Sequence, residues 1–150
     1  MISNKTKYAL KAVLMLTGQY DSKEPILIAE IAEKESIPKK FLEAILLELK
    51  NKGFLQSKKG KGGGYLLARS PDQISFGEVI GLFENPFSVL PCLDAKANRR
   101  CDECSKGSAC GIQIVMQEVY RTTSSILNVT SFQDVHDRMR NMNQEAMYFI

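Results

Sequence analysis

The sequence predicts a mainly α-helical fold with one small β-hairpin and a long helix near the end of the chain. Two short helical segments, separated by about four residues, lie within residues 29–53. A strand, a glycine-rich turn and a second strand follow directly over residues 54–68. A long stretch with helical spacing of its apolar side chains begins near Ile112.

The first predicted helix covers residues 3–18. Ser3 and Asn4 are residue types that cap helix N-termini, and Gly18 is a typical end signal. Apolar positions at helical spacing predict a buried stripe of Tyr8, Ala9, Ala12, Val13 and Leu16. After a loop, a short extended piece leads into a second helix at residues 29–34.

The third predicted helix follows Ser36, a candidate cap, and ends at Gly53. Pro38 suits its first turn, where a missing N–H costs nothing. The predicted buried stripe consists of Phe41, Leu42, Ile45, Leu46 and Leu49, and the opposite face of Lys39, Lys40, Glu43, Ala44 and Lys50. Two such helices, the second starting with basic residues, form a helix-turn-helix pattern. Taken alone, the pair fits any helical hairpin equally well.

The turn between the predicted strands at 54–57 and 65–68 reads KKGKGGG. Lys58, Lys59 and Lys61 suit phosphate neutralisation, while Gly60 and Gly62 let the backbone approach a phosphate or enter a groove. A flexible linker and a nucleotide-binding loop are the alternatives, but the run lacks the spacing of a P-loop or a dinucleotide fingerprint. Because the hairpin directly follows a helix-turn-helix, we interpret it as the DNA-binding wing of a winged helix.

The sequence signals for the elements after the hairpin differ in strength. Ser75 and Glu78 form a capping box for a short helix ending near Phe83. The long helix carries a stripe of Ile112, Val115, Met116, Val119, Thr123, Ile126 and Leu127. A long amphipathic helix after a compact domain favours packing against a twin in a symmetric dimer, with part of the stripe packed on its own domain. The C-terminal stretch predicts a short element at residues 131–135 and, after it, a C-terminal helix that is frayed or swapped. The single histidine, His136, is expected at the surface rather than as a ligand.

Composition and charge narrow the function classes. The chain of 150 residues is 44% hydrophobic, enough for a core. It has no apolar run of about 20 residues and no secretory signal at its start, so we expect a cytoplasmic protein without membrane contact. Residues 1–70 carry 13 Lys/Arg against 7 Asp/Glu, whereas residues 71–150 carry 7 against 10. The basic half suits a polyanionic partner, and an unevenly charged solvated surface is the alternative.

All four cysteines lie in one polar segment, CLDAKANRRCDECSKGSACG, at Cys92, Cys101, Cys104 and Cys110. In a reducing compartment, clustered thiols favour metal ligation or redox sensing over structural disulfides. Thiolates bind iron–sulfur clusters and zinc alike. Disulfide switching is a third possibility, and four unrelated thiols a fourth. The spacing alone leaves cluster and zinc about equally favoured.

Taken together, these segments resemble the IscR/NsrR-type winged helix-turn-helix transcription regulators over about residues 1–130. The resemblance rests on KYALKAVLML, on IAEKESIPKKFLEAILLELKNKGFLQSKKGKGGGYLLARSPDQISFGEVI, and on the cysteine segment before a long helix. Its most specific parts are GGGYLLAR after a basic turn and the preceding Pro38–two residues–aromatic–Leu–Glu pattern.

The resemblance implies a homodimeric bacterial repressor or activator that binds double-stranded operator DNA and has no small-molecule substrate. The helix from Pro38 would lie in the major groove, with Lys39 and Lys40 at its start. Glu43 matches a family position that reads a cytosine amino group. Lys59 matches a minor-groove arginine in the wing, and Lys5 and Tyr8 lie where the first helix nears the DNA backbone. Lys58, Gly60, Lys61 and Gly62 complete the predicted DNA-binding set.

The resemblance also implies an iron–sulfur cluster, either 2Fe–2S or 4Fe–4S, held by three cysteines that match Cys92, Cys104 and Cys110. The fourth ligand varies in the family. It can be a histidine three residues after the last cysteine, where this chain has Gln113. In other members it is an acidic side chain from the partner's first helix, where this chain has Tyr8. Cys101 is the additional thiol and the natural substitute, which predicts an all-cysteine site, with zinc as the less favoured occupant.

The predicted organisation is a DNA-binding domain at 1–83, a sensor segment at 84–111, and a dimerisation helix with C-terminal tail at 112–150. The leading hypothesis is a regulator whose operator binding responds to cluster status, redox state or nitric oxide. The alternative is a regulator of the same fold that senses thiol oxidation, a small molecule or a partner enzyme. An enzyme is not expected, because no nucleophile stands beside a base and no phosphate loop is present.

Overall fold

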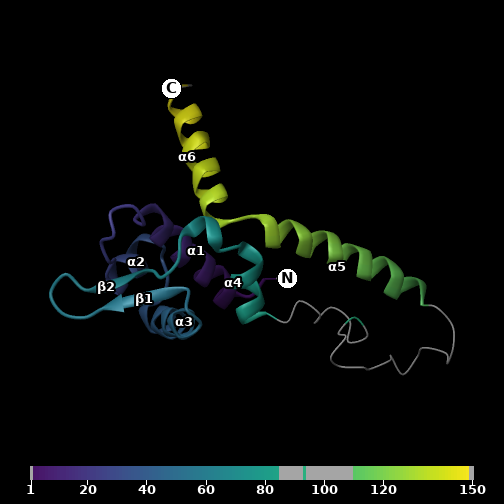
Figure 1. The fold of residues 1–150 in the computed structure, drawn as a ribbon, viewed down its shortest axis with the longest axis horizontal. Coiled ribbons are helices and arrows are strands. Elements are labelled where there is room, and N and C mark those ends of the chain that lie inside the picture. The colour runs from purple at the N-terminus through teal and green to yellow at the C-terminus, as the bar shows by residue number, and fades with distance from the viewer. Residues whose placement is uncertain (1, 85–92, 94–109, 149–150) are drawn as a thin grey trace.

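The computed structural model describes residues 2–84, 93 and 110–148. Its main elements are α1 (Asn4–Gly18), α2 (Ile28–Lys34), α3 (Lys39–Asn51), β1 (Leu55–Lys58), β2 (Gly64–Leu67), η1 (Pro71–Gln73), α4 (Phe76–Phe83), α5 (Gly111–Val129) and α6 (Phe132–Tyr148). Figure 1 shows a body formed by α1–α4 and the hairpin, from which α5 and α6 extend in different directions. The predicted fold class, mainly helical with a hairpin wing, is confirmed.

Helix α1 runs through the middle of the body and contacts α3, α4, α6 and β2. The Ser3 hydroxyl caps its first turn by accepting a hydrogen bond from the Thr6 N–H at 3.2 Å. The predicted stripe is buried along its length at Ala9, Ala12, Val13 and Leu16, while Tyr8 is half-buried. The core that forms around this stripe includes Ile31, Leu42, Ile45, Leu46, Leu49, Leu55, Leu67, Ile74, Val79 and Phe132.

The turn between α2 and α3 corrects the expectation for Ser36. Ser36 does not cap α3, because the helix begins at Lys39 with Pro38 at the capping position and without a side-chain cap. Instead, Ser36 has a φ of 54°, in the left-handed region that few non-glycine residues adopt. The Lys11 ammonium donates to the Glu35 carbonyl at 2.8 Å and pairs with its carboxylate at 3.2 Å. These contacts tie the turn to α1.

The stripe predicted for α3 is buried except at one position. Leu42, Ile45, Leu46 and Leu49 are at most 1% exposed, but Phe41 is 65% exposed. The prediction that Phe41 belongs to the core is therefore wrong. At 100° per residue, Phe41 lies at the flank of the buried arc rather than within it, and the arc is already complete without it.

Strands β1 and β2 form the antiparallel hairpin, with Leu55 opposite Leu67 and Lys58 opposite Gly64. Near its turn, the hairpin is joined to the segment after α1, because Ile26 and Tyr65 exchange two backbone hydrogen bonds at 2.9 Å. Gly64 has a φ of 145°, and a Cβ there would lie 2.3 Å from the Ile26 carbonyl oxygen. Only glycine fits this close approach.

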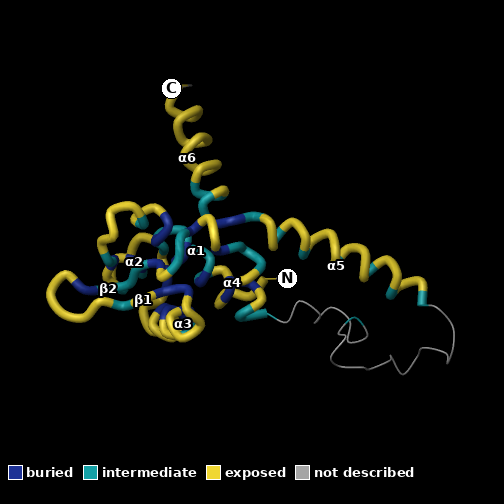
Figure 2. The backbone as a smooth tube through the Cα atoms, viewed as in Figure 1, coloured by how far each residue is buried: buried dark blue, intermediate teal, exposed yellow. Residues whose placement is uncertain are grey.

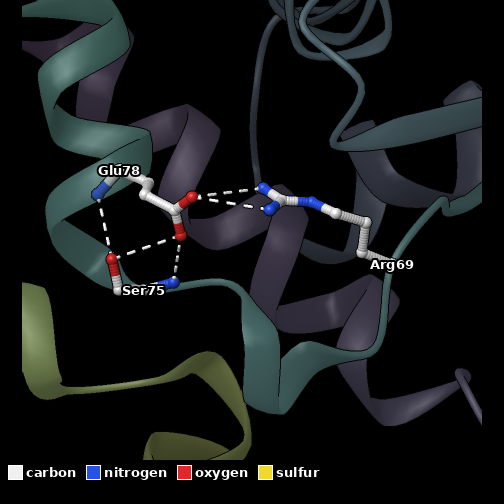
Figure 3. Close-up of polar contacts among 3 residues, drawn as sticks. All are labelled: Arg69, Ser75 and Glu78. Atoms are coloured by element: carbon white, nitrogen blue, oxygen red, sulfur yellow. Dashed lines mark hydrogen bonds and ion pairs between the residues drawn. The ribbon is translucent and has the colours of Figure 1, made fainter.

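Helix α4 is attached to the hairpin through Arg69, as Figure 3 shows. The predicted capping box is present: the Ser75 hydroxyl accepts from the Glu78 N–H, and the Glu78 carboxylate accepts from the Ser75 N–H at 2.9 Å. The same carboxylate receives the Arg69 guanidinium at 3.4 Å, and that guanidinium lies 4.9 Å from the ring centroid of Phe54. Glu78 therefore connects the end of the wing to the start of α4.

The end of α4 returns to the start of α1 through Glu84. Its carboxylate accepts hydrogen bonds from the Ser3 N–H at 2.8 Å and the Thr6 hydroxyl at 2.5 Å. Hydrogen bonds from Ser3 and then Thr6 hold the pKa of the Glu84 carboxyl below its ordinary value of 4.5. The last described residue of the continuous body before the cysteine segment is thus fixed to the N-terminus of α1.

Helices α5 and α6 extend from the body, and α5 has no buried residue (Figure 2). Among the described residues, α5 packs against α4 of the body near its C-terminal end, where Asn128 lies against Gly77. The expected C-terminal arrangement is wrong in one respect: Phe132–Tyr148 is one continuous helix rather than a short element followed by another. Phe132 is buried and stacks on Phe76 with ring centroids 4.3 Å apart.

The Glu84 contacts predict a pH-dependent contribution to stability. Since folding lowers the pKa of Glu84, its contribution is present above pH 4.5 and is lost as the pH falls through the folded-state pKa. We expect Glu84→Gln to lower the melting temperature at pH 7, and the difference from the native chain to shrink between pH 5 and pH 3, measured by thermal unfolding. Glu145→Gln, which removes an exposed carboxylate from α6, is the control. A pH-independent difference for Glu84→Gln would contradict the assignment.

Candidate nucleic-acid interface and cysteine segment

The outward face of α3 carries the residues predicted to enter the major groove. Pro38, Lys39, Lys40 and Glu43 are all exposed, because the apolar arc on the other side of the helix is packed into the core. Helix α3 also contacts β1 and is followed at once by the hairpin, since the Phe54 N–H donates to the Leu49 carbonyl at 3.0 Å. The helix and the wing are therefore neighbouring parts of one surface.

The tip of the hairpin presents the second part of this surface. Lys58, Lys59, Gly60, Lys61 and Gly62 are all exposed. Gly60 and Gly62 have φ values of 92° and 75°, and the Gly63 N–H donates to the Gly60 carbonyl at 3.0 Å. The glycines thus form a tight turn from which three ammonium groups extend into solvent at the end of the molecule away from α5 (Figure 1).

The basic side chains differ in whether their charge is already paired. Among the described residues, the three wing lysines, Lys39 and Lys40 make no ion pair within 4.0 Å. Lys5, in contrast, pairs with Glu48 of α3 at 2.6 Å and lies 4.8 Å from the ring centroid of Phe83. Lys5 and the half-buried Tyr8 sit at the start of α1, so they form a separate group from the α3 and wing residues.

Two exposed apolar residues on α3 were not among the predicted interface residues. Phe41 is 65% and Leu47 51% exposed, and with the exposed Ala44 they are spaced three residues apart. This spacing places them in one row on the helix surface. The signal in the sequence was the helical wheel itself, on which Leu42, Ile45, Leu46 and Leu49 already complete the buried arc.

Three of the four predicted metal ligands, Cys92, Cys101 and Cys104, lie outside the described residues. Cys110 is half-buried and directly precedes α5, at its capping position. Within residues 2–84, 93 and 110–148, no three His, Cys, Asp or Glu side chains gather as a metal site. The segment thus begins after Glu84, which is attached to α1, and ends at the first turn of α5. His136 is half-buried near Gly18, at the end of α1.

In the part of the chain that the structure describes, no helix combines the length and the apolar character needed to cross a membrane.

Comparison with known proteins identifies a family. The family model Rrf2, described as "Iron-dependent Transcriptional regulator", matches residues 2–138. An HTH-type transcriptional regulator of Rhodobacter capsulatus, named rrf2-like, is 38% identical over 137 residues, which cover 90% of this chain and 91% of the relative. These relatives are transcription regulators and not enzymes, as the sequence predicted.

Solved structures confirm the winged-helix fold. The structure of T. potens IscR has a TM-score of 0.75 at 22% identity and covers 93% of this chain and 88% of its own. CymR of B. subtilis, titled a global cysteine regulator, has a TM-score of 0.75 at 23% identity, with coverage of 92% and 97%. Since the family model spans residues 2–138, this protein belongs to the Rrf2 family of transcription regulators, and relatives named NsrR and IscR confirm the resemblance found in the sequence.

Proposed function

We propose that the protein is a homodimeric regulator that binds operator DNA through α3 and the wing, and that an iron–sulfur cluster held by its cysteine segment modulates this binding. The observation that carries the DNA-binding part is the shared surface of α3 and the hairpin. Among the described residues, lysines without an ion-pair partner lie both at the start of α3 and at the tip of the hairpin. DNA-binding transcription regulation is the function of the family.

On this proposal, α3 enters the major groove with Lys39 and Lys40 near phosphates and Glu43 accepting from a cytosine amino group. The wing reaches the adjacent minor groove, with Lys59 inserted and Lys58 and Lys61 beside the backbone. Gly60 and Gly62 keep the tip narrow. Lys5 and Tyr8 lie toward the flanking backbone, where Lys5 would exchange its contact with Glu48 for a phosphate.

The dimer is supported by the exposed face of α5. Ile112, Val115, Val119 and Ile126 share one stripe and are each more than half exposed. A contiguous apolar stripe on a helix extending from its domain is a typical oligomer contact. Two copies joined along α5 would present their α3 helices to half-sites about 34 Å apart, one turn of DNA.

The donor set of residues 92–110 fits an iron–sulfur cluster, because four thiolates match the ligand number of both 2Fe–2S and 4Fe–4S centres. Such a cluster supplies a group that can be gained, lost, oxidised or nitrosylated. Cys110 directly precedes α5, so a change in the ligation of its thiol acts on the helix that carries the proposed dimer face. The family description as iron-dependent supports iron over zinc.

A second candidate is a regulator of the same fold that binds no cluster and senses thiol oxidation, a small molecule or a partner enzyme. The observation in its favour is the likeness to CymR, whose title names cysteine regulation rather than iron. In either case we propose that the protein acts on DNA in the cytoplasm, and that it has no membrane partner and no small-molecule substrate. Residues 1–83 would bind DNA, 84–111 would sense and 112–150 would dimerise.

Removing wing lysines tests the DNA interface. We expect Lys59→Ala and Lys61→Ala each to weaken DNA binding and to reduce the slope of log affinity against log salt concentration by about 0.9, because each lysine neutralises about one phosphate. Fluorescence anisotropy across a salt series measures both quantities. Arg121→Ala, which removes one positive charge from the exposed surface of α5, is the matched control. Unchanged affinity and slope in the wing variants would refute the assignment.

A charge on the α5 stripe tests the dimer. We expect Val119→Glu to convert a dimer into a monomer in sedimentation equilibrium, because a carboxylate would be buried without a partner. Gln117→Glu places the same charge on the opposite, exposed face of α5 and should leave the dimer intact. If both variants sediment like the native chain, the stripe is not the dimer contact.

Reconstitution tests the cluster. After anaerobic incubation with iron and sulfide, we expect visible absorbance and bound iron that are lost in Cys104→Ser and Cys110→Ser and retained in Ser108→Ala. Cys101→Ser distinguishes a fourth ligand from an additional thiol. A colourless protein without iron after reconstitution would refute the cluster proposal. Stoichiometric zinc in that protein would favour a structural metal site.

A further inference from the structure

Helix α3 carries a row of apolar side chains that the core does not use. Phe41, Ala44 and Leu47 are exposed and follow one another at intervals of three residues, so they lie along one ridge. The buried arc of the same helix is complete, since Leu42, Ile45, Leu46 and Leu49 are at most 1% exposed. Single exposed apolar residues are ordinary, but an aligned row beside functional charges indicates a contact surface.

The position of Phe41 limits what that contact can be. Phe41 is the third residue of α3, in its first turn, and the exposed Lys39 and Lys40 directly precede it. The N-terminal residues of a recognition helix are the ones that reach base edges. The two adjacent lysines, Lys39 and Lys40, favour a polyanion over a second protein at this place, because an apolar protein contact would bury their charges.

The major groove offers an apolar contact of its own. Base edges there present hydrogen-bond donors and acceptors, and the C5-methyl group of thymine. For a phenylalanine ring, which can make no conventional hydrogen bond, that methyl group is the apolar feature of a base edge that distinguishes one base from another. Glu43 is two residues further along α3, about 3 Å in rise but about 200° around the helix, so the two side chains would meet different parts of the groove.

We propose that Phe41 is a specificity-determining residue that contacts the C5-methyl group of a thymine in the major groove. Ala44, the next residue of the same row, extends the apolar contact along α3. The inference rests on the proposed DNA-binding function, and it adds a preference for thymine that the lysines and Glu43 do not supply.

Substitution of thymine by uracil tests the contact, since uracil lacks only the methyl group. The probe is the duplex that the full-length native protein selects from a random pool, with each thymine replaced in turn by deoxyuridine. We expect one position in each half-site at which the replacement weakens binding about fourfold, the value of one buried methyl group. In Phe41→Ala the same replacement should change affinity by less than about 1.5-fold, whereas Phe41→Leu should retain part of the dependence.

The control variant is Leu27→Ala, which truncates a side chain that is 54% exposed at the start of α2. It should keep the full dependence on the thymine methyl group. Equal uracil effects in the native protein and in Phe41→Ala overturn the inference, as does a native protein insensitive to every replacement. If Phe41→Ala instead alters the sedimentation of the protein and leaves the methyl dependence intact, the row binds another protein chain and the inference is wrong. Failure of the native protein to enrich any duplex would count against DNA binding itself.

Discussion

The close packing of α1 against α3, α4 and α6 is the constraint on which the rest of the structure depends. Ala9 and Ala12 are fully buried, and their small side chains let neighbouring helices approach the axis of α1. Because one face of α3 is held in this way, its opposite face must be presented to solvent. Helix α1 also holds Glu84 at its N-terminus. It therefore fixes the place from which the cysteine segment departs.

Most of the fold was predictable because its signals are local. Periodicity in α1 and α3, the Ser75–Glu78 capping box, and the glycine-rich turn between two short strands each depend on interactions within a few residues. The interface charges were predictable for a related reason: lysines on a polar helix face or at a glycine turn have little alternative to exposure. Their actual contacts with DNA stay a prediction, as do the roles of the four cysteines.

The failures depend on interactions that are distant in sequence. Ser36 is a residue type that often caps helices, but the packing of α2 against α3 requires a residue with left-handed backbone conformation in the turn between them. Phe41 has the hydropathy of a core residue, and hydropathy does not distinguish core from apolar contact surface. Helix α6 has few apolar residues, and its start depends on Phe132 packing against Phe76, more than 50 residues away. Pairing of Lys5 with Glu48 likewise joins two helices that no local pattern connects.

Within residues 2–84, 93 and 110–148, the contacts of α5 with the α1–α4 body lie near its C-terminal end, which gives the helix the geometry of a lever relative to that body. Its C-terminal part is fixed where Asn128 packs on Gly77, while Cys110 lies at the far end of a helix of 19 residues, roughly 28 Å long at 1.5 Å per residue. A tilt of roughly 10° about the fixed end displaces the far end by about 5 Å. In reverse, a force applied at Cys110 acts on the contact at Gly77 through a long moment arm, and a small displacement at Cys110 rotates the helix only slightly. The geometry therefore suits the conversion of a chemical event at the tip into a torque on α4.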